Sequence, residues 1–66
     1  MANTRCDILK KDRTGTFHWL EALKDLDTAE ARLRQLSKDS AEEFVVFRQT
    51  DLRVVALYSD NQYRRL

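Results

Sequence analysis

The chain has 66 residues, with 12 Lys and Arg against 11 Asp and Glu, one Gly, one Cys and no Pro. This length allows one small domain with a marginal core, and a single Cys with a single His can form neither an internal disulfide nor a structural zinc site. The near-balance of charge gives no bulk attraction to nucleic acid or to an anionic membrane. No apolar run reaches the length of a signal peptide or a membrane span, so we expect a cytoplasmic protein without membrane contact.

The first two patterned segments, Cys6 to Lys11 and Thr16 to Ala22, predict a β-hairpin. A three-residue loop, Arg13-Thr14-Gly15, would place the only glycine at the left-handed position of a type I turn followed by a bulge. This register sets Lys11 opposite Phe17, Leu9 opposite Trp19 and Ile8 opposite Leu20. One face of the hairpin then carries Leu9, Phe17 and Trp19, and a slip by one residue would still leave large apolar groups on both faces.

The third segment predicts a helix over about 28–38. The run Asp27-Thr28-Ala29-Glu30 has the form of a capping box, in which Asp27 accepts from first-turn amides and Glu30 reaches back. An apolar stripe follows at spacings of three and four residues, formed by Leu26, Ala29, Leu33 and Leu36.

The last two segments, Glu43 to Gln49 and Leu52 to Tyr58, are rich in Val, Phe, Leu and Tyr and predict a second hairpin. A two-residue loop sets Arg48 opposite Arg53, which is a like-charge pair, whereas a three-residue loop sets Gln49 opposite Arg53. The sequence leaves both loops open.

The predicted order is β-β-α-β-β, which indicates an α+β fold: a four-stranded, mainly antiparallel sheet with one helix packed on one face. We expect a single domain over 1–66, with an ordered core over about 5–58 and a polar, basic tail over 59–66. A right-handed crossover would place the third strand beside the first and give the spatial order 2-1-3-4.

Apolar side chains occupy both faces of the predicted strands, and one helix can cover only one face. An uncovered apolar face usually marks an interface, so we predict a homodimer joined through its sheets, face to face or by a shared edge. A tail that folds back over the second face is the alternative. The candidate interface residues are Phe44, Val45, Val46, Phe47, Val55 and Leu57.

Few residues of the chain could take part in catalysis or bind a metal. Cys6 is the only thiol and His18 the only imidazole. In the predicted register Cys6 lies opposite Ala22 and His18 opposite Lys10, too far apart for a catalytic dyad. We expect a buried Cys6 and a partly buried His18. A single Gly also excludes a phosphate-binding glycine loop, so we predict a non-enzymatic protein with no cofactor and no metal.

Nucleic-acid binding is the alternative function, because sheet aromatics beside cations can stack on single-stranded bases. Acidic residues are interleaved among the basic ones, so no stripe of a single sign emerges. We therefore favour a small accessory or regulatory module that acts by binding a protein. The candidate nucleic-acid contacts are Arg48, Arg53, Arg64 and Arg65.

The chain resembles small uncharacterised bacterial β-β-α-β-β proteins in three stretches: Gly15-Thr-Phe-His-Trp-Leu-Glu-Ala, Asp25-Leu-Asp-Thr-Ala-Glu-Ala-Arg-Leu-Arg-Gln-Leu and Glu43-Phe-Val-Val-Phe. In these proteins a Trp-bearing hairpin is followed by an Asp-Leu-x-x-Ala helix start and a closing hairpin. The likeness covers about residues 5–58. The chain departs from it at Gln49-Thr50-Asp51, where such proteins often carry a glycine. The resemblance implies a compact single-domain bacterial protein and transfers no catalytic or binding residue.

Overall fold

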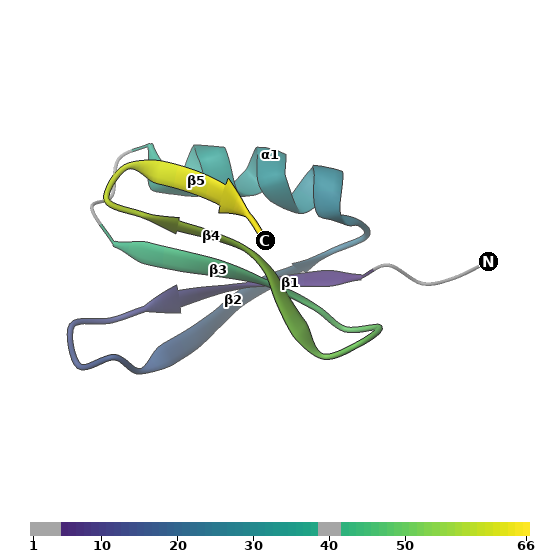
Figure 1. The fold of residues 1–66 in the computed structure, drawn as a ribbon, viewed down its shortest axis with the longest axis horizontal. Coiled ribbons are helices and arrows are strands. Elements are labelled where there is room, and N and C mark those ends of the chain that lie inside the picture. The colour runs from purple at the N-terminus through teal and green to yellow at the C-terminus, as the bar shows by residue number, and fades with distance from the viewer. Residues whose placement is uncertain (1–4, 39–41) are drawn as a thin grey trace.

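A computed structural model describes residues 5–38 and 42–66 as one sheet with a helix across one of its faces (Figure 1). Its elements are, in chain order, β1 (Cys6–Lys11), β2 (Phe17–Leu23), α1 (Leu26–Ser37), β3 (Glu43–Arg48), β4 (Arg53–Ser59) and β5 (Gln62–Arg65). Neighbouring strands are antiparallel throughout, in the order β2-β1-β3-β4-β5. The predicted α+β class and the order of the first four strands are confirmed, but the sheet has five strands and not four.

The additional strand, β5, lies in the segment that the sequence suggests is an irregular tail. The chain turns from β4 into β5 through Asp60 and Asn61, whose φ angles are 52° and 62°. Two central residues with positive φ are typical of a type I′ hairpin turn, and Asp and Asn tolerate that region better than most residues. Because β5 pairs with the outer edge of β4, this segment widens the sheet and does not cover its second face.

The first hairpin has the predicted three-residue loop. Gly15 takes a φ of 88°, and its amide donates to the Asp12 carbonyl at 3.1 Å. The Asp12 amide in turn donates to the Thr16 carbonyl at 2.9 Å and closes the loop. The pairings of Lys11 with Phe17 and of Leu9 with Trp19 are confirmed.

A β-bulge at Leu20 changes the register in the rest of this hairpin. Ile8 lies opposite Glu21, so the predicted pairing of Ile8 with Leu20 is wrong, and Cys6 lies opposite Leu23. Both Leu20 and Leu23 pack against the core. Leu20 and Leu23 are three positions apart, so strict alternation along a strand would place their side chains on opposite faces. The extra residue at the bulge lets both side chains face the core.

The helix begins earlier than predicted, at Leu26, because Asp25 is its N-cap. Asp25 has extended backbone angles, and its carboxylate accepts from the Thr28 amide at 2.7 Å. The predicted cap at Asp27 is wrong, since that residue lies within the first turn. Glu30 does not reach back to the cap either, because it is buried and hydrogen-bonded to β5.

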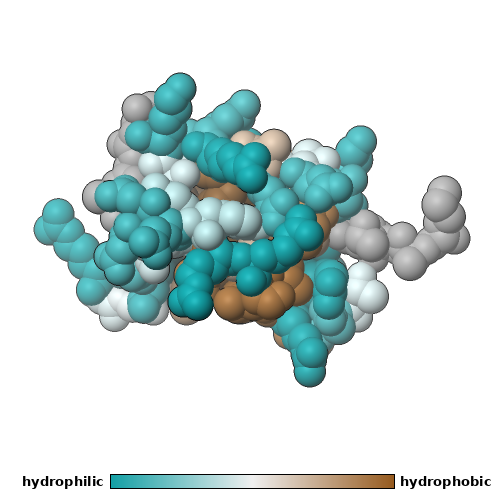
Figure 2. Space-filling view, turned by 45° about the horizontal axis from the view of Figure 1, so that its top comes forward, coloured by the Kyte–Doolittle hydropathy of each residue, from teal (hydrophilic) through white to brown (hydrophobic). Residues whose placement is uncertain are grey.

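The core lies between α1 and the face of the sheet that α1 covers. Its buried residues are Cys6, Ile8, Ala29, Leu33, Phe44, Val46, Val55 and Ala56. Apolar surface is not confined to this core. Figure 2 shows uncovered hydrophobic surface low in the centre of the view, among hydrophilic side chains.

The second hairpin pairs Arg48 with Arg53, as one of the two predicted loops required. The residues between them form a four-residue turn that ends at Leu52, with a φ of 56°, so both predicted loop lengths are wrong. The like-charge pair is relieved because Arg48 donates to Asp51 through Nε at 3.0 Å and Nη2 at 2.6 Å. Bidentate arginine–carboxylate geometry of this kind is favourable in both energy and direction.

Candidate functional site

The face of the sheet opposite α1 carries large apolar side chains in contact with solvent. Trp19 is 57% exposed, Phe17 is 49% exposed and Val54 is 42% exposed. Half-buried apolar residues lie among them. We call this surface the open face. Its large apolar members are Leu9, Phe17, Trp19, Val45, Phe47, Val54 and Leu57, and the register also places Ala22, Asp7, Lys11, Glu43 and Arg64 on it.

One row of side chains crosses the whole open face, with one residue from each strand. Neighbours in the row lie directly opposite one another, in the order Trp19, Leu9, Val45, Leu57 and Arg64. Directly opposed residues of antiparallel strands share a face. Tyr63 and Arg65 both bond to Glu30 on α1, so Arg64 between them points away from the helix. The row is therefore apolar over four strands and ends in a cation on β5.

The structure divides the six predicted interface residues between the two faces. Val45, Phe47 and Leu57 lie half-buried on the open face. The others are in the core beneath α1, where a partner cannot reach them; they are Phe44, Val46 and Val55. The sequence predicts that both faces are apolar, and only the packing of the helix decides which one is covered.

A second β-bulge, at Val55, adds Val54 to the open face. Val46 pairs with Ala56 but Phe47 pairs with Val54, so Val55 is the extra residue. Simple alternation groups Val54 with Ala56, whereas the bulge places Val54 beside Phe47. Phe17 and Trp19, which the candidate interface omitted, could have been found from the predicted hairpin register, which sets them on one face with Leu9.

The charged groups on the open face are mostly paired within the chain. Lys11 and Glu43 lie directly opposite each other on β1 and β3, with Nζ and Oε2 3.3 Å apart. Asp7 is 5% exposed, and its carboxylate accepts a hydrogen bond from the side-chain amide of Gln49. Arg64 differs from these groups, because no carboxylate in residues 5–38 or 42–66 pairs with it.

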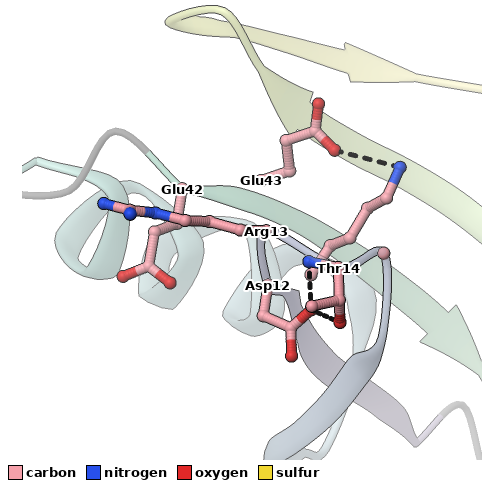
Figure 3. A pocket seen from close by; sticks show the side chains of 7 residues that line it. Asp12, Arg13, Thr14, Glu42 and Glu43 are labelled. Atoms are coloured by element: carbon pink, nitrogen blue, oxygen red, sulfur yellow. Dashed lines mark hydrogen bonds and ion pairs between the residues drawn. The ribbon is translucent and has the colours of Figure 1, made fainter.

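An open hollow lies between the first loop and the start of β3 (Figure 3). Its lining mixes both signs of charge: Lys11, Asp12, Arg13, Thr14, Gly15, Glu42 and Glu43. Lys11 and Glu43 form an ion pair within this lining, and Figure 3 draws it as the dashed line that ends at the Glu43 carboxylate. This mixed and internally paired lining does not favour a ligand of either charge.

Asp12 organises the loop beside this hollow. Its carboxylate accepts from the Thr14 hydroxyl at 2.6 Å and from His18 Nε2 at 2.7 Å, and also from the amides of Thr14 and Thr16. These bonds, that from the Thr14 hydroxyl first and that from His18 next, hold the pKa of Asp12 well below its usual range. Since its lone pairs are engaged in holding the turn, Asp12 acts as a structural group.

The structure does not bring the thiol and the imidazole together. Cys6 is fully buried opposite Leu23, and burial raises the pKa of its thiol. The His18 side chain is 53% exposed, so its predicted partial burial is wrong, and it lies opposite Lys10 with its ring on Asp12. A buried, protonated thiol is a poor nucleophile.

A buried carboxylate fastens β5 to α1. Arg65 donates to both oxygens of Glu30, through Nε and Nη2 at 2.8 Å each, and the Tyr63 hydroxyl also donates to Glu30. These bonds, chiefly from Arg65, lower the pKa of Glu30, while burial and the bond to Glu30 raise the pKa of Tyr63 to about 12. On the opposite side, Arg32 of α1 donates to Glu21 of β2 at 2.7 Å.

The four candidate nucleic-acid contacts do not form one patch. Arg48 is held by Asp51, and Arg65 is held by Glu30. Arg53 and Arg64 are exposed, but Arg53 follows the second loop whereas Arg64 lies on the open face.

Comparisons of the chain with protein-family models, with curated protein sequences and with solved structures find no match. The resemblance to small bacterial proteins therefore stays a prediction. Within the described part of the chain, no three His, Cys, Asp or Glu side chains are grouped to hold a metal ion. None of the helices found there is long and apolar enough to cross a membrane. The geometry of the open face is thus the basis for a functional proposal.

Proposed function

We propose that the protein is a non-enzymatic binding module that forms a homodimer through the open face. The observation that carries this proposal is the exposure of Trp19, Phe17 and Val54 on one face of the sheet. Burying a large apolar side chain is worth about 1.5–3 kcal/mol, and a small domain has only about 5–15 kcal/mol of stability. A contiguous apolar surface of this kind is typical of an interaction site.

The size of the open face fits a second copy of the chain. Five strands spaced about 4.8 Å apart, with three rows of side chains, form a face of roughly 20 Å by 20 Å. Two such faces packed together would bury on the order of 1,000 Å², which is the lower limit for a specific interface. A homodimer of this type is symmetric, with the same patch used by both copies.

The charge of the chain supports a protein partner over nucleic acid. The formal net charge is +1, and two of the four candidate arginines are paired with carboxylates. We place the module in the cytoplasm, where the thiol of Cys6 stays reduced. Retention on an oligonucleotide column at low salt, with a steep loss on adding salt, would instead favour the nucleic-acid alternative.

Sedimentation equilibrium tests the dimer, and the single Trp provides a second readout. We expect a mass that rises from 7.8 kDa toward twice that value at micromolar concentration. The emission of Trp19 should shift to shorter wavelength over the same range, because its exposed indole leaves water. A mass of 7.8 kDa at all concentrations up to several hundred micromolar would overturn the proposal.

A matched pair of variants separates a specific surface from general hydrophobicity. Leu57→Lys places a charge in the middle of the open face and should abolish the dimer. Leu52→Lys makes the same change at a loop residue that is 69% exposed and should leave the dimer intact. Circular dichroism of both variants confirms that the fold is kept.

A further inference from the structure

We propose that the two copies pack so that Trp19 of each copy stacks on Arg64 of the other. The inference rests on the proposed homodimer and specifies its symmetry and its central polar contact. It comes from the order of residues in the row that crosses the open face.

The three central residues of the row are arranged symmetrically about β3. β3 is the middle strand, with two strands on each side. Val45 is at the centre of the row, Leu9 and Leu57 flank it, and Trp19 and Arg64 lie at its two ends. The two ends are about 19 Å apart, because four inter-strand spacings of about 4.8 Å separate the outer strands.

Two sheets packed face to face are related by a twofold axis that lies between them. Aligned strands leave two choices for this axis, parallel or perpendicular to β3. The parallel axis lays β2 of one copy on β5 of the other, so that Leu9 meets Leu57, Val45 meets Val45 and Trp19 meets Arg64. The perpendicular axis lays each strand on its own counterpart and brings the two Arg64 side chains together.

The contacts of Arg64 favour the parallel axis, which also lays the two Glu43 side chains of β3 over one another, each paired with its own Lys11. Two guanidinium groups brought together in an apolar interface would repel and lose hydration without compensation. A guanidinium on the face of an indole is attracted by the ring quadrupole, and Trp is the best aromatic partner for it. Trp19 is 57% exposed, and Arg64 has no carboxylate partner in the described part of the chain, so both are available. The dimer contains this contact twice.

A double-mutant cycle on the whole chain tests the contact. Trp19→Lys should weaken the dimer at least about tenfold, because a lysine then faces Arg64 of the other copy. Arg64→Glu should weaken it several-fold through loss of the stacking. The double variant should dimerise at least about tenfold more tightly than the product of the two single effects predicts, because the introduced charges attract. Sedimentation equilibrium measures all four dissociation constants.

Coupling between these positions has no explanation within one copy, where they lie about 19 Å apart on opposite outer strands and should be additive. Arg53→Glu is the control, since it makes the same charge change at an exposed arginine off the open face, and it should not couple to Trp19→Lys. Additive effects of Trp19→Lys and Arg64→Glu in a wild-type protein that dimerises would overturn this packing and leave the proposed function standing. A wild-type protein that stays monomeric would overturn both.

Discussion

The two faces of the sheet are built by the same strands and meet different surroundings. Val46 is fully buried beneath α1, whereas Val45, its neighbour in β3, lies half-buried on the open face. The two residues are identical in type and in strand propensity. The comparison shows that the position of α1 decides which of these two neighbouring valines is buried.

The two faces also differ in whether the charged side chains near β5 are paired within the chain. On the covered face Glu30 is buried, but Arg65 and Tyr63 satisfy its carboxylate. On the open face Arg64 has no carboxylate partner within the described segments. The covered face is thus complete within one copy, and the open face is completed in our proposal by a second copy.

The largest loss of stability should come from a substitution in the helix that covers one face of the sheet. Leu33→Ala removes a side chain that is 0% exposed and should lower the free energy of unfolding by about 2–5 kcal/mol, since it loses apolar burial and leaves a cavity. Leu52→Ala, at a residue 69% exposed, is the control and should change stability by less than about 0.5 kcal/mol. Urea denaturation measures both. Equal losses for the two variants would contradict the assignment of the core.

The sharpest test compares the two neighbouring valines. Val46→Ala should cost about 2 kcal/mol at any protein concentration, because its two lost methyl groups come from the core. Val45→Ala should cost less than about 1 kcal/mol in dilute solution. Its cost should grow with protein concentration, since a dimer interface adds stability by mass action. A constant cost for Val45→Ala across concentrations would count against the open face as the interface.

Removing the charge of the buried Glu30 carboxylate should lower the stability by a smaller amount, and this loss should depend on pH. Glu30→Gln should lower the free energy of unfolding by about 1–2 kcal/mol at pH 7, because Arg65 loses a charged partner but remains half-exposed. The folded-state pKa of Glu30 is lowered, so its contribution is complete above the unfolded value of about 4.3 and is lost as the pH falls through the folded value. The gap between wild type and variant should therefore close below about pH 4.

Asp27→Asn is the matched control for Glu30→Gln. It makes the same change from acid to amide on the same helix, at a side chain that is 92% exposed and 3.4 Å from Arg65. We expect a loss below about 0.5 kcal/mol at pH 7. A larger loss for Asp27→Asn than for Glu30→Gln would show that the buried carboxylate does not fasten β5.

The smallest loss of stability is expected at Gly15, in the loop between β1 and β2. Gly15→Ala should cost about 1 kcal/mol, because a φ of 88° strains any residue with a Cβ. Crowding is not the cause, since the nearest side-chain atom to the added Cβ would be Lys11 Cε at 3.9 Å. Gly15→Asn should recover part of this loss, because Asn tolerates positive φ better than Ala. Thermal unfolding of the three proteins gives the order.

Local features of this chain could be predicted from the sequence because their causes lie within a few residues. The only glycine marks the first turn, since that turn needs a residue with positive φ. The apolar periodicity of the helix and the β-branched runs of the strands depend on local propensity and alternation. The signal for β5 was also present, in the Asp60-Asn61 pair before Tyr63, but a four-residue strand of mainly polar residues has no period to recognise.

Tertiary packing decided the features on which function depends. The bulges at Leu20 and Val55 shift the register by one residue, and this is enough to move Val54 to the other face. The sequence alone determined that both faces of the sheet are apolar. Which face stays open depended on where one amphipathic helix packs, because that choice is made by contacts between residues far apart in the chain.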